Sequence, residues 1–186
     1  MEKDAITAGV NKIGGLFNTA DIKILICYIL SSLNEAVPGN MMCEVLHHEG
    51  IANIFEVSDA LASLTNTGHI KELDDADGSF IITDSGKDVA ETLKTNVAIV
   101  VRERAYSAVL KMLVRFKNAK QTDFKISREN DRIYLTCSAL DKEFPFMSIK
   151  LLVADEDQAL FIKDKFLNNT SEIYSKLIEM ITRKDT

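Results

Sequence analysis

Four neutral side chains that can hydrogen-bond to DNA bases lie close together in the sequence. They are Ser58, Ser63, Thr65 and Asn66, and Lys71 follows shortly after them. Hydroxyl and amide groups can contact base edges in the grooves of DNA, while a lysine neutralises a phosphate. If these five residues share one surface, we expect that surface to contact double-stranded DNA.

The cations that such a surface needs lie elsewhere in the chain. Residues 97–132 hold nine Lys and Arg against four Asp and Glu, whereas residues 24–70 hold no Lys or Arg. Neutralised phosphates supply most of the non-specific affinity for DNA, so Arg102 and Arg104 are the predicted phosphate contacts. The same basic stretch could instead dock on an acidic surface of the same or a second subunit, or be a solvated face.

The distribution of charge favours a different partner. The net charge is −6, with six Lys and Arg against fifteen Asp and Glu in residues 1–96 and sixteen against thirteen in residues 97–186. Glu56 and Asp59 accompany the four neutral side chains, and residues 74–77 read Asp-Asp-Ala-Asp. Because carboxylates repel phosphate, the alternative hypothesis is an acidic face that binds a basic protein partner and not DNA.

No residue pattern predicts catalysis, a metal site or a cofactor. All three histidines lie between positions 47 and 69, and no nucleophile elbow is present. Cys43 and His47 share a helix face, but zinc needs three or four ligands. Asp75, Asp77 and Gly78 match only part of a calcium-binding loop. We therefore expect a protein that is not an enzyme.

The composition predicts a cytoplasmic protein without a membrane segment. No apolar run approaches the length that spans a bilayer, and the first residues lack the layout of a signal peptide. Three widely spaced cysteines favour reduced thiols over disulfides, with Cys27 and Cys137 in the core.

The base-reading candidates lie on a predicted helix that precedes a hairpin. Apolar residues recur along one stripe from Ile54 to Leu64, so a helix is expected over residues 54–66 and Gly68 is its expected stop. Residues 69–73 and 79–83 predict two strands joined through Asp77-Gly78, a strong hairpin signal.

Two further helices are expected before this unit and one after it. The first covers residues 22–33, with a cap in Thr19-Ala20-Asp21, and the second covers residues 41–48 after a turn at Pro38-Gly39-Asn40. A fourth begins at Asp84-Ser85-Gly86. Three helices followed by a hairpin is the order of a winged helix-turn-helix domain.

The spacing of apolar residues changes in the second half of the chain. A long helix is expected over residues 97–117, then strands near 124–126, 133–139 and 146–153, which should pair as an antiparallel meander. Two helices, 156–167 and 171–182, follow with a break at Asn168-Asn169-Thr170. The predicted class is α+β. Its predicted parts are a flexible N-terminal arm (1–18), a winged helix-turn-helix domain (19–96), a connecting helix (97–117) and a C-terminal α+β domain (118–186).

Aromatic residues of the second half allow two interpretations. They could line a small-molecule sensor pocket or form the hydrophobic core of the C-terminal domain, and the core is favoured because small domains need most of their aromatic residues inside. The set comprises Tyr134, Phe144, Phe146, Phe161, Phe166 and Tyr174.

Three segments carry a resemblance to a known family: Asp21–Leu30, Ile82–Lys87 and Ser171–Tyr174. Over about residues 17–183 the sequence resembles a family of winged-helix proteins from anaerobic Gram-positive bacteria that is known only as a domain of unknown function. The resemblance implies a transcriptional regulator with a C-terminal α+β domain, and it implies no ligand, operator or reaction.

The predicted function is therefore a winged-helix transcriptional regulator that binds DNA as a homodimer. The alternative is a winged-helix protein–protein interaction module whose acidic face does not bind DNA directly. A ligand-gated version of either is a third hypothesis, which depends on the aromatic residues of the second half.

Overall fold

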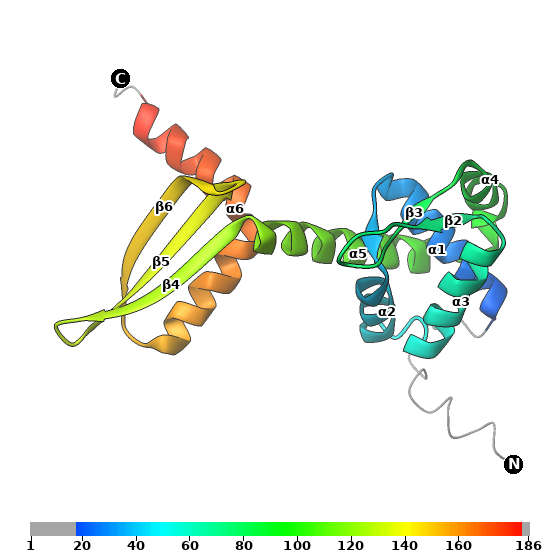
Figure 1. The fold of residues 1–186 in the computed structure, drawn as a ribbon, viewed down its shortest axis with the longest axis horizontal. Coiled ribbons are helices and arrows are strands. Elements are labelled where there is room, and N and C mark those ends of the chain that lie inside the picture. Colours follow the sequence, from blue (N-terminus) through cyan, green and yellow to red (C-terminus); the bar gives the residue numbers. More distant parts are fainter. Residues whose placement is uncertain (1–17, 184–186) are drawn as a thin grey trace, which may run out of the picture. The chain divides into compact units, whose positions relative to one another are not determined.

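The computed structural model of the protein describes residues 18–183, which form helices and two three-stranded antiparallel sheets (Figure 1). This confirms the α+β class. The chain divides into two compact units, the first ending at Leu113 and the second beginning at Val114. The predicted N-terminal arm, residues 1–18, lies outside the described residues except for Asn18.

Three helices open the first unit and share one core. They are α1 (Thr19–Leu33), α2 (Gly39–His48) and α3 (Ile54–Asn66). The apolar stripes of the three helices are buried, since α3 packs against both α1 and α2. The cap of α1 is Asn18, whose side-chain oxygen accepts the N–H of Ala20 at 2.9 Å. The predicted cap in Thr19-Ala20-Asp21 is therefore wrong, because these residues already form the first turn of α1.

A small sheet completes the surface beside α3. The predicted hairpin is present as β2 (Ile70–Glu72) and β3 (Ser79–Ile82). A third strand, β1 (Val37–Pro38), pairs with β3, which gives the order β1-β3-β2. The sequence predicted a turn at Pro38, and that prediction is wrong for this residue. Two residues are too few to show an alternating pattern, so only pairing with β3 defines this strand.

The predicted fourth helix is present, and a short 3₁₀ helix follows it. They are α4 (Asp84–Leu93) and the short 3₁₀ helix η2 (Lys94–Asn96), which precede α5 (Ile99–Lys120). The boundary between the two units falls inside α5. Within the first unit α5 buries small and branched apolar side chains at every fourth position: Val101, Ala105, Val109 and Leu113.

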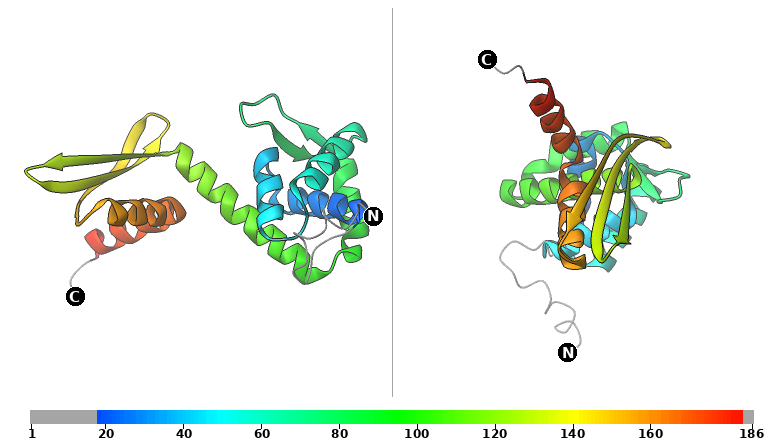
Figure 2. Two further views of the ribbon diagram at one scale, coloured as in Figure 1. Left: turned by 90° about the horizontal axis from the view of Figure 1, so that it is seen from below. Right: turned by 90° about the vertical axis from the view of Figure 1, so that its left-hand side faces the viewer.

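The second unit is an antiparallel meander covered on one face by a helix (Figure 2). Its elements are β4 (Thr122–Glu129), β5 (Arg132–Asp141), β6 (Phe144–Val153) and α6 (Glu156–Thr182). Alternate residues of β5 point toward α6, which confirms the period of two seen in the sequence. Its core consists of Leu135, Cys137, Ala139, Met147, Val153, Ala159 and Phe166.

The predicted break between two C-terminal helical segments is present. The two expected C-terminal helices are segments of α6, which kinks at Asn169 (φ −136°, ψ 22°). The Asn169 amide donates to the carbonyl oxygen of Lys165 at 2.8 Å, and the Thr170 hydroxyl donates to that of Phe166 at 2.7 Å. These side chains bond to carbonyl groups of the preceding turn, at the point where the two helical segments of α6 meet.

Candidate binding groove

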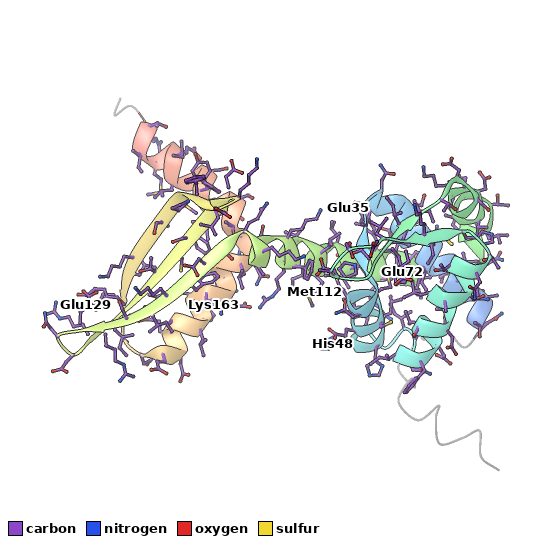
Figure 3. All side chains as sticks on the ribbon, in the orientation of Figure 1. Glu35, His48, Glu72, Met112, Glu129 and Lys163 are labelled. Atoms are coloured by element: carbon purple, nitrogen blue, oxygen red, sulfur yellow. The ribbon has the colours of Figure 1, made fainter. Side chains whose placement is uncertain are left out.

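A groove with a volume of about 690 Å³ lies on the first unit between α2, α3 and the β2–β3 hairpin. Three of its residues are acidic, Glu44 from α2, Glu72 from β2 and Asp77 from the hairpin loop. Figure 3 shows Glu72 on the hairpin strand, while His48 at the end of α2 points away from the body of the unit. The remaining lining residues are Gly39, Asn40, Cys43, Ile54, Ser58, Leu61, Ala62, Thr65, Asn66, Gly78 and Phe80.

The wall formed by α2 and the hairpin is held together by a close backbone contact. The Gly39 N–H donates to the carbonyl oxygen of Gly78 at 3.1 Å. A Cβ at Gly39 would lie only 2.5 Å from the ring of Phe80, so glycine is needed for this close approach. Gly78 has φ +57°, a left-handed conformation that glycine adopts readily. The start of α2 is thereby fixed against the hairpin.

The hairpin loop is ordered by one of its own carboxylates. The Asp75 side chain accepts hydrogen bonds from the backbone N–H of Asp77 at 3.1 Å and of Ser79 at 2.9 Å. Hydrogen bonding from Ser79 and from these backbone groups lowers the pKa of Asp75. The acidic loop that resembled part of a calcium site is therefore built around an Asx turn.

The groove face of α3 is set by a cap and a buried stripe. Asn53 and Glu56 form a capping box, in which the Asn53 side chain accepts the Glu56 N–H at 2.9 Å and the Glu56 carboxylate accepts the Asn53 N–H at 3.2 Å. Val57, Leu61 and Leu64 are buried residues of α3, and Leu61 also contributes to the groove lining. Glu56 thus has a structural role at the helix start.

The structure brings three of the seven predicted contact residues together. Ser58, Thr65 and Asn66 line the groove. Thr65 donates its hydroxyl hydrogen to the carbonyl oxygen of Leu61 at 3.0 Å, so its oxygen is left to accept a bond from a ligand. Ser63 and Lys71 do not line the groove.

The two predicted phosphate contacts lie away from the groove and engage other residues of the first unit. The Arg102 guanidinium lies over the ring of Tyr28, with its central carbon 5.1 Å from the ring centroid. Arg104 Nε lies 3.8 Å from Glu49 Oε2, and the Tyr28 hydroxyl donates to Glu103 at 2.9 Å. Arg102 and Arg104 are half-buried, and neither lines the groove.

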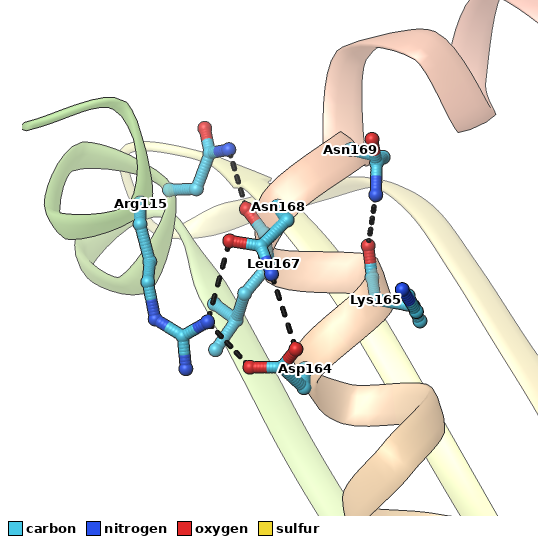
Figure 4. Close-up of polar contacts among 7 residues, drawn as sticks. Arg115, Asp164, Lys165, Leu167, Asn168 and Asn169 are labelled. Carbon is cyan, nitrogen blue, oxygen red and sulfur yellow. Dashed lines mark hydrogen bonds and ion pairs between the residues drawn. The ribbon is translucent and has the colours of Figure 1, made fainter. Parts of the chain in front are cut away.

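Other members of the basic stretch form ion pairs inside the second unit. Arg115 binds Asp164 and, at 3.3 Å, the side-chain oxygen of Asn168, whose amide in turn donates to Asp164 at 3.2 Å (Figure 4). Arg128 pairs with Glu156 at 2.7 Å. These cations of the basic stretch therefore pair with carboxylates of the second unit itself.

The aromatic residues that were candidates for a sensor pocket have different environments in the second unit. Phe166 is in the core, where its ring packs edge-on against Phe124 with centroids 5.7 Å apart. Phe146 and Tyr174 pack edge-to-face, with centroids 5.2 Å apart, and line a cavity of about 240 Å³. Phe144 and Phe161 are largely exposed. The expectation that these aromatic residues fill the core is correct for Phe166 and wrong for Phe144, Phe146 and Phe161, which are each more than half exposed.

The described residues also show the state of the cysteines and the outcome for metal sites and membrane helices. Cys27, Cys43 and Cys137 are buried free thiols. Among residues 18–183, no group of three His, Cys, Asp or Glu is placed to hold a metal ion. Over the same residues, no helix combines the length and the apolar character needed to span a bilayer.

Comparison with known proteins places the sequence in a single family. A family model described as Domain of unknown function (DUF4364) matches residues 22–181, a range that covers most of both units. No curated protein and no solved structure matches the chain.

Proposed function

The chain belongs to this family of unknown function, and we propose that its first unit is a winged helix-turn-helix domain that works as a protein-interaction module. In this proposal, the groove beside α3 binds a basic, amphipathic segment of a partner protein. The winged-helix assignment is supported by the order of three helices, a hairpin and a short third strand.

The lining of the groove carries the proposal. Glu44, Glu72 and Asp77 face it, and no Lys or Arg of the described chain is among its lining residues. The whole first unit, counted over residues 18–113, holds seven Lys and Arg against fourteen Asp and Glu. A negatively charged surface attracts cationic partners and repels phosphate.

The apolar residues of the groove indicate the second property of the partner. Ile54 is 41% exposed, and Leu61, Ala62 and Phe80 are further apolar residues of the lining. A helix that presents apolar residues on one face and Lys or Arg on its flanks is complementary to such a groove. Burial of apolar surface supplies affinity, while the carboxylates select for positive charge.

Binding of designed peptides tests this proposal. The probe is a fluorescein-labelled amphipathic helix of Leu and Lys, and its control is the same peptide with Glu in place of Lys. We expect the lysine peptide to bind, and the combined substitutions Glu44→Lys and Glu72→Lys to weaken its binding by about tenfold. The matched control, Asp59→Lys with Asp88→Lys, makes the same charge change outside the groove and should leave affinity close to wild type. Equal binding of both peptides would contradict the proposal.

Direct DNA binding by a dimer is the second candidate, and one observation favours it. Ser58, Thr65 and Asn66 are neutral hydrogen-bonding residues on the groove face of α3, where a winged helix reads base edges. Anisotropy with labelled genomic fragments between about 50 and 200 mM salt tests it, because a DNA reader loses affinity steeply over this range. Binding with such a slope would favour DNA, and the absence of binding at about 50 mM salt would favour the protein-interaction module.

A further inference from the structure

The second unit exposes apolar side chains along one strand and the end of one helix. Phe144 is 78% exposed, Met180 76% and Ile181 71%. Phe146 packs against Tyr174, so the strand residues and the helix residues adjoin each other. We name this surface the β6–α6 patch: Phe144, Phe146, Tyr174, Ile178, Met180 and Ile181.

We infer that the β6–α6 patch is the interface through which two copies of this chain pair. The inference does not depend on the groove or on what binds there. It rests on three features of the second unit: the area of the patch, the charge of the two sheet edges, and the spacing of residues along α6.

The exposed area is large enough for a stable dimer. With about 150–250 Å² for a large aromatic side chain and somewhat less for an aliphatic one, the patch exposes on the order of 600 Å² of apolar surface. That area is at the upper limit for the largest apolar patch of a typical monomer. A standard interface buries about 800 Å² per partner, of which little more than half is apolar.

The two edges of the sheet differ sharply in charge. The β4 edge carries four charged residues among eight, a common device against edge-to-edge association. In β6, the other edge strand of the described sheet, Lys150 is the one charged residue among ten. Pro145 near the start of β6 has no N–H to donate, but the rest of the strand, residues 146–153, is a nearly uncharged edge that can pair with another strand. Antiparallel pairing of β6 with β6 of a second copy obeys twofold symmetry, the commonest arrangement of homodimers.

The spacing along α6 extends this edge into a continuous surface. Tyr174, Ile178 and Ile181 recur at i, i+4 and i+7, so they form one stripe on the segment after the kink. Ile173 and Leu177 pack against the core from the same segment. One side of this segment is thus packed against the core of its own unit. The outward stripe would be buried in turn by β6 and α6 of a second copy.

Light scattering of the full chain at several concentrations tests the inference. We expect a mass twice that of the 20.7 kDa chain, and a monomer at every concentration would overturn the inference. Combined substitutions Phe144→Asp and Ile181→Asp should raise the dimer dissociation constant by about 100-fold or more. The matched control is Phe55→Asp, because Phe55 is 81% exposed on the first unit, outside the patch, and its loss should leave the dimer intact. A dimer of unchanged affinity in the double variant would place the interface elsewhere and overturn the inference.

Hydrogen exchange provides an independent readout if the double variant does not fold. Backbone N–H groups of β6 should exchange slowly in concentrated wild-type protein and faster after dilution, because strand pairing between copies protects them. Exchange of β4, the charged edge, should not depend on concentration. Identical exchange of β6 at both concentrations would overturn the inference.

Discussion

Gly86 lies so close to His69 that a Cβ at position 86 would overlap the carbonyl oxygen of His69. Gly86 is in the first turn of α4, and His69 lies between α3 and β2. The contact joins α4, which follows the hairpin, to the turn that precedes the hairpin. A side chain at position 86 would prevent this contact, so the segment Thr83-Asp84-Ser85-Gly86 needs a glycine at its fourth position.

We predict that Gly86→Ala lowers the free energy of unfolding by about 2–3 kcal/mol. The added methyl group meets a backbone carbonyl that cannot move without shifting β2, which makes this a case of overpacking. Urea denaturation followed by circular dichroism measures the change. Ser85→Ala, at the exposed neighbouring position, is the control, and equal stability of the two variants would contradict the close contact.

Thr83 secures the same junction through its hydroxyl group. The Thr83 Oγ1 accepts the Gly86 N–H at 3.2 Å as the cap of α4 and lies within donating distance of the carbonyl oxygens of Gly68 (2.7 Å) and His69 (2.8 Å). We predict that Thr83→Ala lowers the free energy of unfolding by about 1–2 kcal/mol. Thr83→Ser keeps the hydroxyl and should stay close to wild type in the same denaturation experiment. A serine variant as unstable as the alanine variant would show that the hydroxyl is not the cause.

The ion pair of Arg115 should contribute more to stability than that of Arg128. Arg115 and Asp164 are each more than half buried and share Asn168, whereas Arg128 and Glu156 are exposed and form a simple pair. We predict a loss of about 1 kcal/mol for Arg115→Met and less than about 0.5 kcal/mol for Arg128→Met. Thermal denaturation of the second unit, monitored in the full chain, compares them. Equal losses of stability in the two variants would show that the contacts of Arg115 with Asp164 and Asn168 contribute no more than an exposed ion pair.

Stability should fall in alkaline solution because of Cys27. Burial raises the pKa of the Cys27 thiol from 9.0 to about 11. The unfolded chain therefore loses this proton at lower pH than the folded chain, so the stabilisation is complete below pH 9 and is lost as the pH rises to about 11. The total effect is about 2–3 kcal/mol. Denaturation of wild type and Cys27→Ala at several pH values tests this, since the variant should have the flatter profile. Parallel profiles would exclude Cys27 as the source.

Reversal of charge in the groove should create or strengthen DNA binding. Glu44→Lys with Glu72→Lys replaces two carboxylates by two cations on the face where Ser58, Thr65 and Asn66 lie. We expect higher affinity for mixed DNA, with a logarithmic salt slope steeper by about two, one unit for each new phosphate contact. Anisotropy over a salt series measures both quantities. Asp88→Lys with Glu91→Lys on α4 makes the same change in net charge elsewhere, and an equal gain from it would point to net charge alone.

Local patterns in the sequence determined most elements of the fold. The helix over residues 54–66, the hairpin after it and the alternation of β5 and β6 all follow from the positions of apolar residues relative to periods of 3.6 and 2. These periods arise from backbone geometry within a few residues. The same reasoning placed Ser58, Ser63, Thr65 and Asn66 on this helix, and all of them except Ser63 line the groove.

The tertiary structure alone decided the composition of the groove and the environment of the distant cations. Glu44, Glu72 and Asp77 come from three different segments, and only the docking of α2 on the hairpin brings them to one groove. Arg102 was a predicted phosphate contact, yet its guanidinium lies on Tyr28, a residue more than seventy positions away in the chain. Such contacts depend on which distant segments pack together, and the free energy that selects them comes from burial of the whole core, which no short stretch of sequence encodes.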